Sequence, residues 1–251
     1  DPAEKYFFAS TTIGEKEIHR AETESFQPLY SPDGKKIAFL AARDEIQVLD
    51  RATGKTHIAL GGKHNYSYED GDLVFDWSAD SKWLTADYAT NGRLFVPNIG
   101  VFPADGSKEP TDISRSGYTD MFPFWGRAGE VVLWSSARFG QRDHGSWGRE
   151  FDIMAAFLTQ DAYDMFTLSK EEYALVKELK DEKEKAAGGV ERKDKDQEKK
   201  VQDLKIEWDD LGDRTIRLTK NSEDLDSAVL NTDWSKLYWL TFFDKGSRLW
   251  E

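Results

Sequence analysis

The sequence contains no cysteine. Disulfides therefore contribute nothing to stability, and neither a thiolate nucleophile nor a cysteine-based zinc site is available. Positive charge is also scarce: 34 lysines and arginines stand against 47 aspartates and glutamates, for a formal net charge of −13. Because binding to phosphate groups depends on an excess of cations, this balance argues against nucleic acid or an anionic lipid surface as a partner.

Long apolar runs are missing as well. No stretch approaches the roughly 20 residues that a membrane-spanning helix needs, so no membrane insertion is expected. The chain begins at Asp1, with neither methionine nor a signal peptide, which indicates that it has been processed or cut. Its 251 residues are enough for one large domain with a substantial core, or for two small ones.

Aromatic residues, by contrast, make up 13% of the chain, and many of them fall within a recurring pattern. The pattern is first seen in "YSPDGKKIAF", Tyr30–Phe39, where "SPDG" suits a tight turn between two strand-forming runs. It returns as "VFDWSADSKWLTADY" from Val74, "MFPFWGRAGEVVLWSS" from Met121 and "AVLNTDWSKLYWLTFF" from Ala228.

The spacing of these copies predicts the fold. Ser31 and Ser78 lie 47 residues apart, and Ser78 and Gly126 lie 48 apart. From Gly126 to Thr232 the separation is 106 residues, which is one repeat plus an insertion. A period of about 40–50 residues in strand–turn–strand units is typical of β-propeller blades. We therefore predict an all-β fold: a β-propeller with TolB- or WD40-like blades of four antiparallel strands and one helical, charged insertion.

The whole chain is expected to form a single propeller segment. Its predicted parts are a partial blade at 1–25, blades at 26–62, 72–114 and 120–219, and a partial blade at 225–251. Both ends then fall within a blade. This favours a partial propeller, cut from a larger ring, over a small four-bladed ring closed by strands from opposite termini.

The insertion, 160–203, interrupts the third blade. Ser169 and Glu172 have the spacing of a capping box, and the apolar stripe that follows them predicts a helix up to about Glu184 that lies on the propeller. The mixed-charge run beyond it cannot bury enough apolar surface to offset the entropy of ordering it. We interpret that run as a solvated excursion, with a docking arm for another domain or subunit as the alternative.

Two stretches are more specific than the general propeller pattern. They are Ala137–Glu172, which contains "HGSWG" at His144–Gly148, and "WDDLGDRTIRLT" at Trp208–Thr219. Both resemble the propeller region of bacterial tricorn-like serine peptidases, which are multidomain members of the C-terminal-processing peptidase group (S41). The "SPDG" turns are shared with TolB and with prolyl-oligopeptidase propellers, so they discriminate less. The resemblance extends over nearly the whole chain.

The resemblance implies a non-catalytic propeller that guides or filters unfolded peptides toward an active site elsewhere. In that family the propeller precedes a PDZ-like domain and a serine peptidase domain, which become the expected partners within the same parent chain. Peptide or unfolded protein is the implied substrate, and homo-oligomer formation is left open. A periplasmic location is implied by such relatives, with the cytoplasm as the alternative.

No catalytic residue is predicted within the chain itself. No G-x-S-x-G is present, and we do not expect His144 and Ser146 to form a base–nucleophile pair. We interpret the stretch as a structural loop with Trp147 as a packing anchor. The alternative is a peptide-contact site that faces a channel, where arginine would bind a peptide carboxylate. Its candidate residues are Arg138, Arg142, His144 and Trp147.

Metals and cofactors are not predicted either. The run 63–72 brings His64, Glu69, Asp70 and Asp72 together, but it lacks EF-hand spacing and favours a surface loop between blades. The tryptophans and tyrosines fall mostly within the repeated strands, where core packing is favoured over glycan binding.

The leading hypothesis is therefore a propeller segment of a tricorn-like serine peptidase that contributes substrate access or domain assembly rather than bond cleavage. The second is a TolB-like propeller that binds protein partners and is not attached to a protease. A glycan-binding propeller is the third.

Overall fold

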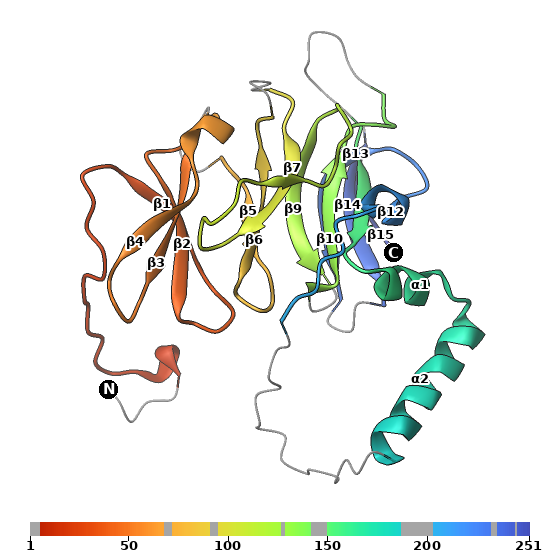
Figure 1. Ribbon diagram of the computed structural model, residues 1–251. Helices are drawn as coiled ribbons and strands as arrows, with labels where there is room; N and C mark the ends of the chain where they lie inside the picture. Colours follow the sequence, from red (N-terminus) through yellow and green to blue (C-terminus); the bar gives the residue numbers. More distant parts are fainter. Residues whose placement is uncertain are drawn as a thin grey trace.

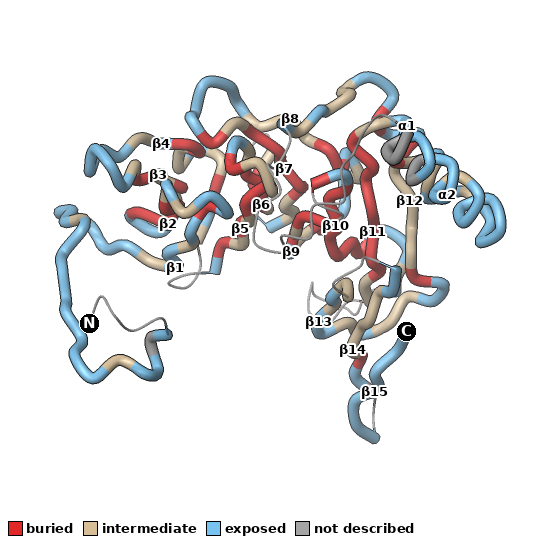
Figure 2. Tube along the Cα trace, turned by 90° about the horizontal axis from the view of Figure 1, so that it is seen from below, coloured by how far each residue is buried: buried red, intermediate tan, exposed pale blue. Residues whose placement is uncertain are grey.

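The computed structural model describes residues 6–67, 72–90, 95–126, 129–141, 150–186, 203–231, 235–243 and 245–251. Its strands form four sheets that follow one another along the chain, and within each sheet neighbouring strands pair antiparallel. The sheets stand side by side in an arc (Figures 1 and 2). This is the predicted arrangement of successive propeller blades.

Three blades have four strands and the last has three. Blade 1 consists of β1 (Ser25–Tyr30), β2 (Lys36–Ala41), β3 (Glu45–Asp50) and β4 (Thr56–Leu60). Blade 2 consists of β5 (Phe75–Trp77), β6 (Trp83–Tyr88), β7 (Asn98–Pro103) and β8 (Thr111–Asp112). Blade 3 consists of β9 (Asp120–Gly126), β10 (Val131–Ser136), β11 (Asp152–Phe157) and β12 (Thr215–Arg217). Blade 4 consists of β13 (Asp224–Leu230), β14 (Leu237–Phe243) and β15 (Gly246–Trp250). Figure 2 shows the first strand of each blade on the concave side of the arc.

The turn after the first strand is built by the same side-chain bonds in blades 1 and 2. Ser31 Oγ donates to Asp33 at 2.6 Å and accepts from the backbone N–H five residues further on at 2.9 Å, and Ser78 makes both bonds at the same distances. In blade 4 the side-chain oxygen of Asn231 accepts the equivalent N–H at 3.0 Å. Asn231 rather than Thr232 is therefore the repeat position, because an amide oxygen replaces the hydroxyl there.

Tryptophans on the first strands join successive blades. Trp77 on β5 donates its indole N–H to the Leu29 carbonyl of blade 1 at 3.1 Å, and Trp125 on β9 donates to the Asp76 carbonyl of blade 2 at 3.2 Å. Both tryptophans are buried. The prediction that the aromatic residues of the repeated strands pack between blades is confirmed for these two.

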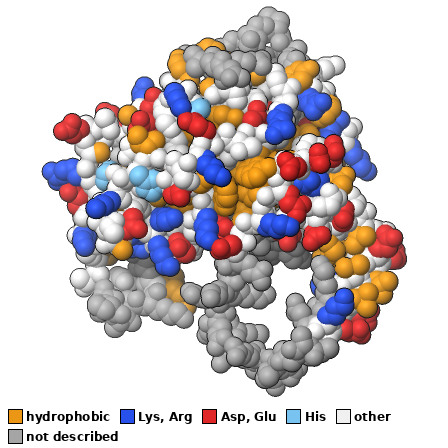
Figure 3. Space-filling view, viewed as in Figure 1, with side chains coloured by type: hydrophobic (Ala, Val, Ile, Leu, Met, Phe, Trp, Pro, Cys, Tyr) orange, Lys and Arg blue, Asp and Glu red, His pale blue; other side chains and the backbone are white. Residues whose placement is uncertain are grey.

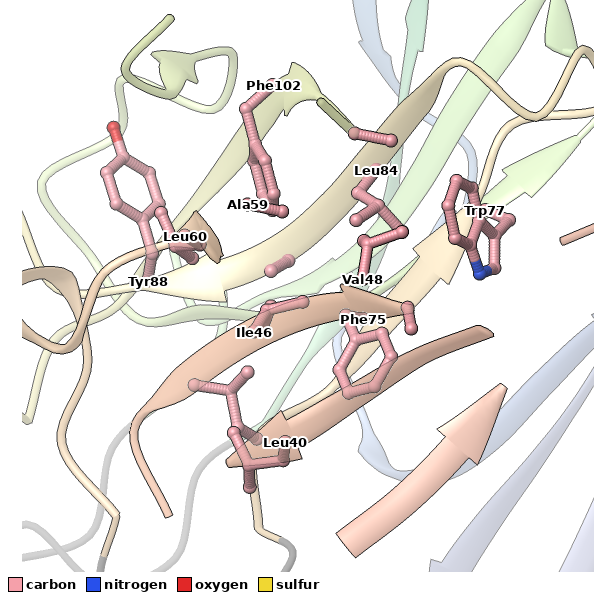
Figure 4. Close-up of a cluster of buried hydrophobic side chains, with 14 residues drawn as sticks. Leu40, Ile46, Val48, Ala59, Leu60, Phe75, Trp77, Leu84, Tyr88 and Phe102 are labelled. Carbon is pink, nitrogen blue, oxygen red and sulfur yellow. The ribbon is translucent and has the colours of Figure 1, made fainter. Parts of the chain in front are cut away.

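Apolar side chains fill the space between neighbouring blades. Between blades 1 and 2, Leu40, Ile46 and Val48 meet Leu84 and Phe102 (Figure 4). Equivalent clusters lie between blades 2 and 3 and between blades 3 and 4. β2 is buried along nearly its whole length, as its continuous run of small and apolar residues predicts for a strand covered on both faces.

The chain before β1 differs from the predicted partial blade at 1–25. Residues 6–24 contain one 3-10 turn, η1 (Phe7–Ala9), and no strand. The His19 ring lies 5.0 Å from the ring of Phe39. Phe39 belongs to a small apolar cluster on the face of blade 1 that is turned away from blade 2. This segment therefore lies against blade 1 and does not extend its sheet.

The insertion begins with a helix that the sequence did not predict, α1 (Gln160–Thr167). Thr159 caps it by accepting the Ala162 N–H at 3.1 Å. The rings of Tyr163 and Phe166 lie 5.8 Å and 4.7 Å from that of Phe157 on β11. α1 is therefore packed against blade 3.

The second helix, α2 (Lys170–Ala186), has the predicted capping box: Ser169 N–H donates to Glu172 at 2.9 Å, and Glu172 N–H donates to Ser169 at 3.3 Å. The prediction that this helix lies on the propeller is wrong. It points away from the sheets (Figure 1), and Leu175 and Leu179 of its apolar stripe are 57% and 49% exposed. No described helix is both long enough and apolar enough to span a membrane.

The chain returns from the insertion along the seam between blades 2 and 3. Leu204 N–H donates to Asp80 in the blade 2 turn at 2.8 Å. The side chains of Leu204 and Trp208 then pack into the apolar cluster between the two blades. A 3-10 turn, η5 (Leu211–Arg214), leads into β12, which completes blade 3. Another 3-10 turn, η2 (Gly62–His64), follows β4.

Candidate functional site

Of the four residues predicted to contact peptide, Arg138 is in the described part of the chain. Arg142, His144 and Trp147 lie outside the described residues. Arg138 is exposed, and its guanidinium lies 5.3 Å from the centre of the Phe139 ring. The grouping of these four side chains stays a prediction.

The Phe139 ring lies between Arg138 and a hydrogen-bonded network at the edge of blade 3. A second guanidinium, that of Arg217 on β12, lies 5.2 Å from the same ring. Arg217 donates to Asp152 at 2.8 Å and to Ser222 Oγ at 3.2 Å, and Ser222 Oγ donates to Asp152 at 2.7 Å. Asp152 is fully buried, so these charge-assisted bonds hold the side chains of Arg217 and Ser222 in one geometry.

A pocket of about 680 Å³ adjoins this network, between blades 3 and 4. It is called the blade 3–4 pocket below. Its lining carries charges of both signs and one aromatic ring: Glu150, Ser222, Glu223, Asp224, Phe242, Lys245 and Arg248. Ser222 belongs to the network around Asp152. Glu150 lies two residues after Gly148, the last residue of "HGSWG", so the predicted contact residues are joined by the chain to the edge of this pocket.

Two glutamates of the pocket are brought together by backbone pairing. Phe151 N–H donates to the Glu223 carbonyl at 2.8 Å, and Glu223 N–H donates back at 3.3 Å, as an isolated antiparallel bridge. The carboxylate of Glu150 accepts the Gln141 N–H at 2.9 Å. Glu223 Oε2 is buried and accepts no hydrogen bond from any described residue. A buried carboxylate oxygen without a donor is costly.

A second pocket of about 590 Å³ shares Glu223 in its lining. The rest of its lining mixes apolar and polar residues and includes two stacked indoles, Trp239 and Trp250, whose ring centres are 6.4 Å apart. The other lining residues are Phe166, Leu218, Lys220, Asn221, Leu230, Ser235, Lys236, Leu237 and Glu251.

Three further carboxyl groups lie within blades 2 and 3. Burial raises the pKa of Asp87 on β6 to about 7, although hydrogen bonds from the backbone of Val74 and Phe122 favour the charged form. Phe122 has a φ of 59°, in the left-handed region that a bulky residue seldom adopts, and it lies at a bulge in β9. Because the Phe122 backbone bonds to Asp87, this carboxyl group helps to hold the strained bulge. Burial likewise raises the pKa of Asp76 and of Asp120.

The acidic run 63–72 is described in part. His64 bonds Glu109, which joins this loop to the segment before β8. Glu69 and Asp70 lie outside the described residues. Within the parts of the chain that the structure describes, no group of three or more potential ligands is placed to hold a metal ion.

Comparison with known sequences gives partial matches. No protein-family model matches the chain. A protein of Trichophyton equinum named dipeptidyl-peptidase 5 is 31% identical over 133 residues, which cover 47% of this chain and 17% of that protein. The protein of the same name from Arthroderma otae is 27% identical over 141 residues, which cover 50% and 18%. The matched region thus spans less than a fifth of the length of these relatives.

Comparison with solved structures identifies the fold. The crystal structure of the tricorn protease matches with a TM-score of 0.51 at 15% identity, over 86% of this chain and 19% of that chain. A TolB structure from Agrobacterium tumefaciens gives a TM-score of 0.39 at 24% identity, over 56% and 48%. The four successive antiparallel sheets and the match to the tricorn protease show that the chain is a segment of a β-propeller. The predicted fold class is confirmed.

The residues that define the blade 3–4 pocket could not be recognised from the sequence. Glu150 and Glu223 are 73 positions apart, and no motif links them. Asp87 did leave a signal, because it is a charged residue in a strand whose neighbours Ala86 and Tyr88 are both buried.

Proposed function

We propose that the chain is a non-catalytic propeller segment of a peptidase, where it guides or filters peptide substrates and supports the assembly of the parent protein's domains. One observation carries the proposal: a comparison by sequence and a comparison by structure lead independently to proteins named as peptidases. The resemblance of "HGSWG" and "DRTIRLT" favours a serine peptidase of the S41 group in the periplasm, with a PDZ-like domain. The names of the relatives favour a dipeptidyl-peptidase, and the proposed role is the same in either parent.

The geometry between blades 3 and 4 suits contact with a peptide. The blade 3–4 pocket offers carboxylates, two cations and the half-exposed ring of Phe242, so it can bind polar groups and apolar stems together. Arg138, which is not among the lining residues, is exposed and lies against the Phe139 ring. Apolar side chains also gather near the middle of the face seen in Figure 3, with charged side chains around them.

The 251-residue chain is expected to bind unfolded casein and to leave it intact. Fluorescence anisotropy of labelled casein measures binding, and gel electrophoresis after prolonged incubation measures cleavage. A folded protein of similar size is the control and should not bind. Turnover that a serine-directed inhibitor abolishes would contradict the non-catalytic role, and failure to bind casein would contradict the substrate role.

The second candidate is a TolB-like propeller that binds protein partners and belongs to no protease. The exposed apolar stripe of α2 favours it, because Tyr173, Leu175 and Leu179 stand clear of the blades. The parent gene discriminates between the two candidates. PDZ and peptidase modules encoded beside this segment support the first, and their absence from the whole reading frame supports the second.

A further inference from the structure

Carboxyl groups take part in the polar contacts between blades 2 and 3. This boundary, where β9 packs against β5 and β6, is called the blade 2–3 seam below. Asp76 on β5 accepts the backbone N–H of Trp125 on β9 at 2.9 Å. Asp87 on β6 accepts the backbone N–H of Phe122 in the bulge of β9. Two carboxyl groups of blade 2 therefore hold the first strand of blade 3.

A third carboxyl group, that of Asp120, lies at the start of β9. Asp120 is fully buried and accepts the indole N–H of Trp134, in the apolar cluster between the two blades, at 3.2 Å. It also accepts hydroxyl groups from Ser114 and Ser116, in the segment that leads from β8 to β9. Asp120 thus ties blade 3 to its connection with blade 2.

No cation balances these three carboxyl groups in the described part of the chain. Among the described residues, none of Asp76, Asp87 and Asp120 forms an ion pair. The strands around Asp87 carry two other charged groups, Asp76 on β5 and Asp120 on β9, and β7 carries none. Asp72, just before β5, adds a further negative charge that acts on Asp87. The seam therefore surrounds Asp87 with acidic groups.

Other charged groups of blade 2 already have partners. Lys82 in the turn between β5 and β6 forms an exposed ion pair with Asp203 at 2.6 Å. His64 in η2 bonds Glu109. Neither cation is an ion-pair partner of the carboxyl groups at the seam.

Two comparisons single out the blade 2–3 seam. Next to blade 4, the fully buried Asp152 is paired with Arg217 at 2.8 Å, so its charge is compensated. The segment that Asp87 holds is also strained, because Phe122 has a φ of 59°. Release of this segment would relieve that strain.

Burial makes the charged form of a carboxyl group costly where no cation is near. It raises the pKa of Asp76, Asp87 and Asp120, for Asp87 to about 7. These protons are lost more easily from a seam that water has entered, so ionisation favours opening. We propose that the blade 2–3 seam is a pH-sensitive hinge, which is closed while its carboxyl groups hold their protons and opens as they ionise. Blades 1 and 2 then move against blades 3 and 4.

Amide hydrogen exchange of the 251-residue chain, followed by NMR, tests the inference. The N–H groups of Phe122 and Trp125 report on the seam, and that of Leu40 in the buried strand β2 reports on unfolding of the whole chain. After correction for intrinsic exchange rates, protection of the two seam groups should fall about tenfold per pH unit between about pH 5 and 7, because opening releases the Asp87 proton. It should level off above about pH 8.

Urea separates opening of the seam from global unfolding. Low concentrations of urea should lower the protection of Leu40 and leave that of Phe122 and Trp125 nearly unchanged, because a hinge exposes little surface. If all three N–H groups share one free energy of exchange and one urea dependence, unfolding of the whole chain explains the pH effect and the hinge is wrong.

Asp87→Asn keeps the shape of the side chain but does not titrate, so it should remove most of the pH dependence at both seam groups. Asp226→Asn, which neutralises an exposed carboxylate on β13, should leave the dependence unchanged. An unchanged slope in Asp87→Asn would overturn the role of Asp87. A flat profile in the unmodified chain would overturn the hinge itself, and this measurement holds even if Asp87→Asn folds poorly.

Discussion

Replacing Trp134 with alanine is expected to lower the free energy of unfolding by about 3–5 kcal/mol. Trp134 is 1% exposed and lies in the apolar cluster between blades 2 and 3. Its indole N–H also donates to Asp120 at 3.2 Å. Alanine would leave a cavity where the indole packs, and it would take one donor away from a carboxyl group that has no access to water.

Urea unfolding followed by circular dichroism measures this change. Trp134→Phe is the matched control, because it removes the hydrogen bond, at about 1–2 kcal/mol, while it keeps an aromatic ring and most of the buried volume. Equal losses in the free energy of unfolding for Trp134→Ala and Trp134→Phe would contradict the expectation that packing between blades 2 and 3 dominates at this position.

The second large effect is a pH dependence at Asp87. Its pKa is about 7 in the folded protein, against an ordinary value of 3.8. Because the folded state keeps a proton that the unfolded state releases, the stability due to Asp87 is fully present below pH 3.8 and is lost as the pH rises through 7. The shift corresponds to at most about 4 kcal/mol over that window. The free energy of unfolding should therefore fall between pH 5 and 8 by roughly 2–3 kcal/mol.

Urea midpoints at several pH values, in constant ionic strength, measure this slope. Asp87→Asn should flatten the profile, since asparagine does not titrate. Asp226→Asn on the exposed face of β13 should keep the slope of the unmodified chain. Identical slopes for the unmodified chain and Asp87→Asn would show that the Asp87 carboxyl does not carry the effect.

The blade pattern could be predicted because its determinants are local. In the turns of blades 1 and 2 the serine bonds to an aspartate two residues on and to a backbone N–H five residues on, so Ser31 and Ser78 reveal the repeat in the sequence itself. The repeat pattern puts the fourth copy one residue late, because Asn231 accepts the turn N–H through an amide oxygen and not through a serine hydroxyl. The capping box of α2 is equally local, and it was predicted correctly.

Features that depend on distant contacts could not be predicted in this way. The direction of α2 is set by the fold around it, and its apolar stripe falsely indicated a packed helix. Glu223 has no sequence signature, because its environment is made by Phe151 and by the hairpin of β14 and β15. Phe122 likewise adopts positive φ through a strand register that only the paired β10 reveals.

The long detour between β11 and β12 makes blade 3 a composite of two separate lengths of polypeptide. The second length is held independently, by pairing of Arg217 with Met154 and by the bond from Leu204 to Asp80. A protease that severs α2 should therefore yield two fragments that still travel together through a sizing column. The same site would accept a reporter domain, or a new pair of chain ends, while the remaining blades stay as they are.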